Sequence, residues 1–286
     1  MADEAKTLVE EILGWTDHIL ANETLTEDVH GLLSDLEDRI ANTLRRFVGK
    51  TGATADKVRA YMATANKLIG AAYDHIDATV EKGLTTVAKD AYAATTKGIS
   101  KLFGVDFTGE RTLSAPELKT IASDSLVLNN VTSEWWSGQA ENLYQSFSQQ
   151  MRLGLLNNEN LDDLVKRVRG TAAANYTDGI IRLPEAQAEA LIRTAMVNSA
   201  NQARLDTYAK NNDLITAVRW ITAHDQRVDD PCLVLADLTW TMPDDAEDYA
   251  AYKPIRHKHP FPGPIVHFNC RCVQAPVLRP LGKPKE

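Results

Sequence analysis

The 286-residue sequence lacks an unbroken apolar run of the roughly 18 residues that a membrane-spanning helix needs, although 44% of its residues are hydrophobic. Its first residues, MADEAKTLVEE, are acidic and lack the basic and apolar regions of a signal peptide. Aromatic residues make up only 7% of the chain. We therefore expect synthesis in a cytoplasm and a helix-rich fold with enough apolar side chains to build a core.

Cysteine is also scarce: there are three, an odd number that argues against a fully paired disulfide framework and fits reduced thiols. The formal net charge is −8, which does not favour a general binder of polyanions. The charges are uneven, because an acidic block at residues 225–248 is followed by a basic end. Two solvated faces are the simpler interpretation. The alternative is contact with DNA or a partner protein through Lys258, Arg271, Arg279, Lys283 and Lys285.

The first hundred residues have helical periodicity. Apolar residues recur at helical spacing over residues 8–19, 32–47 and 58–91, and Thr24–Glu27 is predicted as a capping box before the second run. GKTGAT at 49–54 lacks the spacing of a phosphate-binding loop, so it is predicted to connect two helices. Glycines 98 and 104 then predict a domain boundary near residue 110.

The second half begins with sharper helix signals. Ser114-Ala-Pro-Glu117 is a capping box with proline in the first turn, and further helices are predicted over about 132–155 and 184–210. Residues 157–170 are predicted as a turn, a cap and a short helix that Gly170 ends. On the helix over 184–210, Thr194, Asn198 and Asn201 fall on one stripe. We predict that this stripe holds the irregular chain that follows, the alternative being a solvated face.

Strand signals are confined to the last quarter. LITAVRWITA (214–223), CLVLADLTWTM (232–242) and IVHFNCRCV (265–273) are each predicted as a short strand, and the third would place Cys270 and Cys272 on one face. The predicted fold class is therefore α+β and predominantly α-helical. Residues 1–110 form an extended helical region that docks on a partner, and residues 111–286 form a domain of helices with a small β-sheet.

Two clusters of side chains can order the loop at 225–264. Asp225 and Arg227 follow the predicted strand that carries Trp220, and we interpret them as a staple in which the carboxylate caps backbone donors and the guanidinium binds carboxylates or carbonyls. Arg193 and Asn198 are their predicted partners. Asn269 suits a turn before the cysteines.

The second cluster is a candidate metal site. Cys232, His267, Cys270 and Cys272 supply a Cys3His donor set for zinc, although H-x2-C-x-C is not a common zinc spacing and His257 and His259 compete. The simpler interpretation is that reduced cysteines pack the loop onto the sheet. A disulfide from Cys232 after release into an oxidising medium is a further alternative.

Enzymatic readings are weaker. His224 beside Asp225, with the neighbouring carboxylates, would suit a metal-dependent nuclease, and His267 near Cys270 a thiol nucleophile. An irregular loop does not preorganise such groups. We therefore predict that the chain is not an enzyme and needs no cofactor, zinc being the exception left open.

Several motifs occur together in one order: MRLGLLNNENLDDLVKRVR (151–169), RTAMVNSANQA (193–203), W-x4-D-x-R (220–227), Pro-Cys (231–232) and P-x2-H-x-N-C-R-C (264–272). Over roughly residues 130–275 this combination resembles the Mu F-like minor head protein, or head morphogenesis, family of tailed bacteriophages. CLVLADLTW departs from the family, which often has a glycine-bearing turn after the first cysteine.

The resemblance implies a low-copy structural protein of the virion, located in the phage head near the portal. It implies the portal protein and the major capsid protein as partners, non-specific contact with DNA, and no membrane during assembly. Its expected role is head morphogenesis and an influence on DNA packaging or ejection, exerted by binding. The alternatives are a metal-dependent phage nuclease and a free cytoplasmic helical scaffold.

Overall fold

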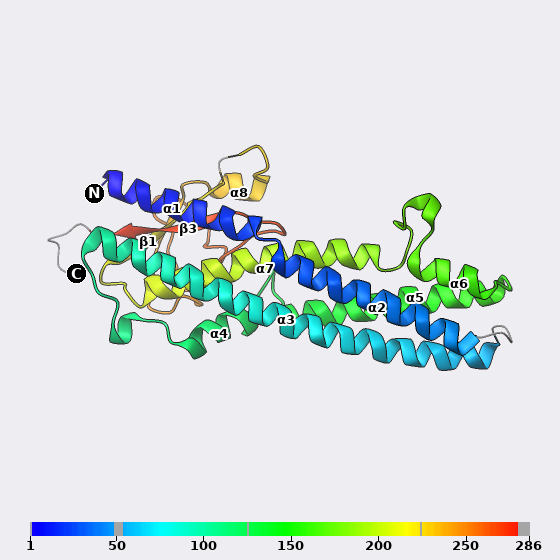
Figure 1. Cartoon of the computed structure of the whole chain (residues 1–286). Coiled ribbons are helices and arrows are strands. Elements are labelled where there is room, and N and C mark those ends of the chain that lie inside the picture. The colour runs from blue at the N-terminus through cyan, green and yellow to red at the C-terminus, as the bar shows by residue number, and fades with distance from the viewer. Residues whose placement is uncertain (1, 49–53, 125, 224, 280–286) are drawn as a thin grey trace. The chain divides into compact units, whose positions relative to one another are not determined.

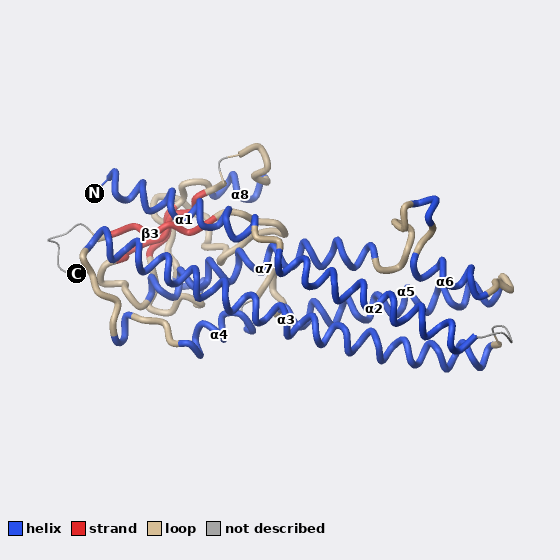
Figure 2. The backbone as a smooth tube through the Cα atoms, viewed as in Figure 1, coloured by secondary structure: helices blue, strands red, loops and turns tan. Residues whose placement is uncertain are grey.

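The computed structural model describes residues 2–48, 54–124, 126–223 and 225–279. Most of the predicted connection at 49–54 lies outside the described residues, as do His224, Lys283 and Lys285. The fold is α+β and predominantly α-helical, with one small antiparallel sheet, as the sequence predicts (Figures 1 and 2). Within the described ranges, no helix combines the length and the apolar character needed to cross a membrane.

The elements follow the predicted order closely. The helices are α1 (Ala2–Ala21), α2 (Thr24–Val48), α3 (Ala55–Phe103), α4 (Ala115–Asp124), α5 (Thr132–Leu156), α6 (Leu161–Arg169), α7 (Arg182–Ala209) and α8 (Asp230–Leu235). Short 3-10 turns lie at Gly109–Arg111, Ala172–Ala174 and Tyr249–Ala251. The strands are β1 (Ile215–Ile221), β2 (Thr239–Thr241) and β3 (Val273–Leu278). Their order in the sheet is β2-β1-β3.

The chain forms two compact units that divide it differently from the predicted boundary near residue 110. Unit 1 comprises Met1–Asn22, Glu81–Val131 and Arg193–Glu286, and unit 2 comprises Glu23–Val80 and Thr132–Ile192. The reason is that α3 and α7 are continuous helices that contribute to both units. Gly98, read as part of a boundary, lies inside α3, where an added Cβ would come within 2.7 Å of Leu8 Cδ1.

Unit 2 is built on apolar helix faces. Leu33, Leu36, Ile40 and Leu44 of α2 are all at most 1% exposed, which is what their helical spacing predicts. Tyr61 of α3 meets Phe147 of α5 edge-on at 5.3 Å between ring centroids. The Tyr61 hydroxyl donates to the Ile40 carbonyl at 3.0 Å, so a polar group in this core is satisfied.

Unit 1 contains the sheet. The central strand β1 pairs antiparallel with β2 and β3, and Trp220 stands opposite Gln274 of β3. The predicted capping box starts α4: the Ser114 amide donates to Glu117 Oε2 at 2.7 Å, and the Glu117 amide donates to Ser114 Oγ at 3.4 Å. The sheet and α7 hold the chain segments that carry the cysteines.

Three local predictions are corrected. Residues 232–242 do not form one strand: α8 comes first and β2 follows, because Pro231 in the first turn favours a helix and Asp237 takes a φ of 61°. β3 begins only at Val273, so Cys270 and Cys272 lie in the segment that precedes this strand and not within it. α2 begins at Thr24 itself, where the Glu23 carbonyl accepts from the Glu27 amide at 2.8 Å.

Candidate metal centre

Three thiols converge in unit 1. Cys232 lies on α8, Cys270 in the turn after residue 264 and Cys272 just before β3, and each is at most 2% exposed. Their sulfurs all lie within 4.8 Å of one another, and Cys232 Sγ is 3.7 Å from Cys270 Sγ, so the thiols are free. His267 Nε2 lies 3.1 Å from Cys232 Sγ. The three cysteines of the predicted donor set therefore form one group, and His267 lies beside Cys232.

His267 is oriented by its other ring nitrogen. Nδ1 lies 3.1 Å from Asp229 Oδ2 and 2.7 Å from the Phe268 carbonyl oxygen, both of which are acceptors. A proton on Nδ1 satisfies them and leaves the Nε2 lone pair facing Cys232 Sγ. A carboxylate behind a histidine in this way is the usual support of a metal-ligating imidazole. Sequence reasoning missed Asp229 as part of this site, because it was read only as one carboxylate of the acidic block.

The thiols are electrostatically unequal. Hydrogen bonds from the Cys232 and Cys272 thiols hold the pKa of Cys270 well below its ordinary value, to about 3. The hydrogen bond to Cys270 raises the pKa of Cys232 well above its ordinary value. The cluster thus accommodates one thiolate readily and disfavours a second. Metal ligation requires deprotonated thiols, and the positive charge of a bound cation would offset the repulsion between them.

The predicted stripe on α7 holds the loop beside the cysteines. The Thr194 hydroxyl accepts from the Asn269 amide at 2.8 Å, and Asn269 itself has a φ of 59°. Asn201 Nδ2 donates to the carbonyls of Pro264 and Cys272, each at 2.9 Å. These bonds attach the chain on both sides of the turn to α7, and they thereby fix the positions of Cys270 and Cys272.

Asn198 and Arg193 do not act as predicted. Asn198 is fully buried on the same stripe, and its amide oxygen and nitrogen have no hydrogen-bond partner within the described residues. Arg193 is half-buried and forms no hydrogen bond or ion pair with the residues that the structure describes. Neither contacts the Asp225 corner through a polar bond, so their assignment to that staple is wrong.

Asp225 is instead held by arginines that follow it in sequence. It accepts from the Arg227 amide at 2.9 Å and from the Arg227 guanidinium at 3.2 Å. Arg271 adds two bonds of 2.8 and 2.6 Å to the same carboxylate, and these hold the pKa of Asp225 below its usual range. The Arg271 side chain is only 15% exposed. Its predicted contact with DNA or a partner is therefore corrected to an internal ion pair between the two ends of the loop.

The remaining predicted residues are dispersed. Trp220 is fully buried in β1. Lys258 is exposed, whereas Arg279 donates from Nε to the Asp213 carbonyl at 2.9 Å. His257 donates from Nε2 to the Thr239 carbonyl at 2.8 Å and packs edge-on against Trp240. The competing histidine therefore belongs to an aromatic cluster in the loop. In the described part of the chain, the cysteine trio is the group of three or more potential metal ligands that comes together.

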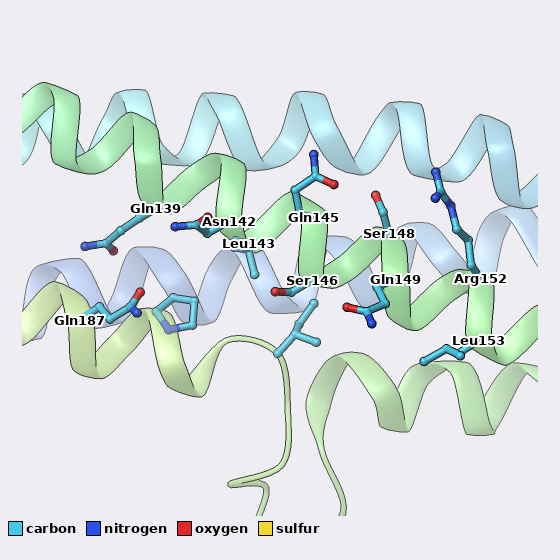
Figure 3. Close-up of a pocket in the computed structure, with 12 residues that line it drawn as sticks. Gln139, Asn142, Leu143, Gln145, Ser146, Ser148, Gln149, Arg152, Leu153 and Gln187 are labelled. Carbon is cyan, nitrogen blue, oxygen red and sulfur yellow. The ribbon is translucent and has the colours of Figure 1, made fainter.

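Unit 2 offers a different kind of site. A cleft of about 540 Å³ lies along α5 and the first turns of α7, and Figure 3 shows that amide and hydroxyl side chains line it. Two buried oxygens there, Gln139 Oε1 and Ser148 Oγ, lack a hydrogen-bond partner within the described residues. The lining supplies hydrogen bonds but no general base. Sequence reasoning missed it, and the signal it left is the run of glutamines and serines on the polar face of α5.

Comparisons with known proteins identify one family. Residues 145–275 match the family described as phage Mu protein F like protein. Neither the curated proteins nor the solved structures contain a match to the chain. The matched range begins within α5 and ends in β3, so it includes the α7 stripe, the Asp225 corner and all four candidate metal ligands.

Proposed function

Because residues 145–275 match the family described as phage Mu protein F like protein, we propose that this chain is a minor head protein of that family that acts by binding near the portal. Its partners would be the portal protein and the major capsid protein, with non-specific contact to DNA. In this role it would assist head morphogenesis and influence DNA packaging or ejection. The family match carries the proposal.

The chemistry of the matched region supports binding over catalysis. Asp225 is neutralised by Arg271, and Asp229 is engaged with His267, so these carboxylates are occupied in holding the loop. A metal-dependent nuclease needs carboxylates that converge on a cation. No carboxylate group of that kind occurs within the residues that the structure describes.

The test is reconstitution. Heads assembled without this chain are mixed with the purified full-length protein, separated by sedimentation, and probed for the chain and for its association with the portal protein. We expect co-sedimentation and a portal contact. Failure to associate with either heads or portal protein would sink the proposal. A plasmid-cleavage assay with Mg²⁺ should show no cleavage, and cleavage lost in Asp229→Asn would favour the nuclease instead.

We further propose that Cys232, His267, Cys270 and Cys272 hold a structural zinc ion. The donor set is the one zinc prefers, and a tetrahedron with Zn–S bonds of about 2.3 Å places sulfurs roughly 3.8 Å apart. The observed separation of Cys232 Sγ and Cys270 Sγ is 3.7 Å. Asp229 would fix the imidazole, and the burial of all three cysteines would close the site to solvent. When bound, the metal would cross-link α8 to the start of β3.

The zinc proposal is tested by metal analysis of the full-length protein. We expect about one zinc per chain, and we expect chelation or Cys272→Ser to expose residues 225–272 to protease, because structural zinc contributes folding free energy directly. His257→Ala is the matched control, since that histidine bonds the Thr239 carbonyl and should leave the zinc content unchanged. Protein that is free of metal and equally resistant to protease would disprove the site.

A further inference from the structure

A pocket in unit 1 carries positive charge that its own carboxylate does not balance. It has a volume of about 280 Å³ and is lined by α1, the last turns of α3 and one side chain of α7. Its polar and aromatic lining consists of Glu11, Trp15, Thr95, Lys97, Lys101 and Arg204. Figure 1 shows α1 alongside the C-terminal part of α3 in this unit.

Arg204 is the most unusual of these residues. It is 1% exposed, and it donates to Asn201 Oδ1 at 2.7 Å and to Thr16 Oγ1 at 3.0 Å, both neutral acceptors. Its guanidinium lies 5.0 Å from the centroid of the Trp15 ring. No carboxylate pairs with it in the described chain. Buried charges are normally paired, and burial without a counter-charge lowers the pKa of Arg204 to about 10.

Thr95 gives an independent indication of a ligand. Its side chain is 2% exposed, and its hydroxyl has no hydrogen-bond partner within the described residues. A buried hydroxyl without a partner is costly, and this one lines the same pocket as Arg204. A ligand oxygen in the pocket would satisfy it.

The rest of the lining sets the sign of the ligand. Lys97 is exposed and forms no ion pair with the described residues, whereas Lys101 lies 3.6 Å from Glu11 and balances it. The pocket therefore combines three cations with one carboxylate that is already paired. Guanidinium, ammonium and hydroxyl groups are the donors that tetrahedral oxyanions accept from, and charge-assisted bonds of this type are the strong ones.

We propose that this pocket binds a small tetrahedral oxyanion, namely inorganic phosphate or the phosphate group of a small ester. The anion would supply the counter-charge of Arg204 and the missing partner of the Thr95 hydroxyl. This site is separate from the cysteine cluster in its ligands and does not depend on the role in head assembly.

The experiment measures phosphate binding to the full-length protein by calorimetry and by thermal melting, in buffers matched to chloride at the same ionic strength. We expect saturable binding at one site and a higher melting temperature in phosphate than in chloride. Sulfate should bind as well, since it shares the shape and the charge.

Three variants sharpen the result. Thr95→Val keeps the side-chain shape and removes the unsatisfied hydroxyl, so it should raise the melting temperature without phosphate while weakening phosphate binding about tenfold. Lys97→Ala should weaken binding about threefold, because one partly screened charge is lost. Lys89→Ala removes the same charge from an exposed position of α3 outside the pocket and should have no effect.

The outcomes that overturn the proposal are distinct. Phosphate that acts no differently from chloride removes the site. Equal losses in Lys97→Ala and Lys89→Ala would show a general effect of charge. A Thr95→Val variant that melts lower and binds phosphate normally would show that the hydroxyl serves the fold.

Discussion

Unit 2 and the loop-bearing part of unit 1 are stabilised by different means. In unit 2, apolar side chains repeat at helical spacing and are removed from water together, as with Leu33, Leu36 and Ile40 of α2. Between residues 225 and 272 there is little regular structure, and order comes from single bonds at fixed points, such as those made by Asn201 and Arg271. A long irregular segment inside a folded unit needs such contacts. A substitution in the core of unit 2 should therefore destabilise the whole unit, whereas a substitution in the loop should have a local effect.

The largest effect is expected from the core of unit 2. Phe147→Ala should lower the free energy of unfolding by about 3–5 kcal/mol, because it removes a fully buried ring that packs on Tyr61 and leaves a cavity. Chemical denaturation with a helix signal measures the loss. Leu156→Ala, at a position 78% exposed on the same helix, is the control and should change little. Equal losses in both variants would contradict a packed core here.

A smaller and more local effect is expected in the loop. Asn201→Ala removes the bonds to the Pro264 and Cys272 carbonyls and leaves Arg204 short of an acceptor, which should cost about 3 kcal/mol. Hydrogen exchange should locate the loss at 225–272. Asn198→Ala, on the same stripe but without hydrogen bonds in the described structure, should be nearly neutral. Equal losses of stability in Asn201→Ala and Asn198→Ala would contradict the view that single hydrogen bonds order the loop.

The smallest effect is a dependence on pH. Burial raises the pKa of Asp206 to about 7, and neighbouring Glu247 and Asp245 add to the rise, while a hydrogen bond from Gln202 opposes it. The ordinary pKa of an aspartate side chain in the unfolded chain is about 3.9. The folded state therefore binds the proton more tightly, so its contribution to stability is complete below about pH 4 and is lost as pH rises through about 7.

Urea denaturation between pH 4 and 8 tests this. Asp206→Asn should remove that part of the pH dependence and be more stable than the wild type at pH 8. Asp90→Asn, an exposed position on α3, should retain the wild-type slope. A wild-type stability that does not fall between pH 4 and 7 would contradict the assignment.

The same contrast explains how much the sequence could predict. The helices follow from periodicity and capping residues: α4 begins where its capping box predicts, and α5, α6 and α7 begin and end within a few residues of their predicted positions. The four candidate metal ligands were also identified together, because cysteine and histidine are rare enough in this chain for their grouping to carry information. Patterns that repeat, or residue types that are scarce, are accessible without coordinates.

The errors fall where a single long-range contact decides the structure. Besides Arg227, Asp225 is paired with Arg271, 46 residues later, and nothing in the local sequence distinguishes Arg271 from the other arginines. The division into units was also missed, since α3 and α7 keep one apolar period across it. The start of β3 was misplaced because alternating apolar residues describe a strand and the turn before it equally well.

Arg204 connects the pocket in unit 1 with the cysteine cluster. Arg204 lines the pocket proposed to bind phosphate and donates to Asn201 Oδ1, while Asn201 donates to the carbonyl of Cys272, one of the proposed zinc ligands. Asn201 and Arg204 lie three residues apart on α7, so the two proposed sites rest on one hydrogen-bonded pair of side chains. Thermodynamic reciprocity then requires that whatever factor phosphate imposes on the affinity for zinc, zinc imposes the same factor on the affinity for phosphate.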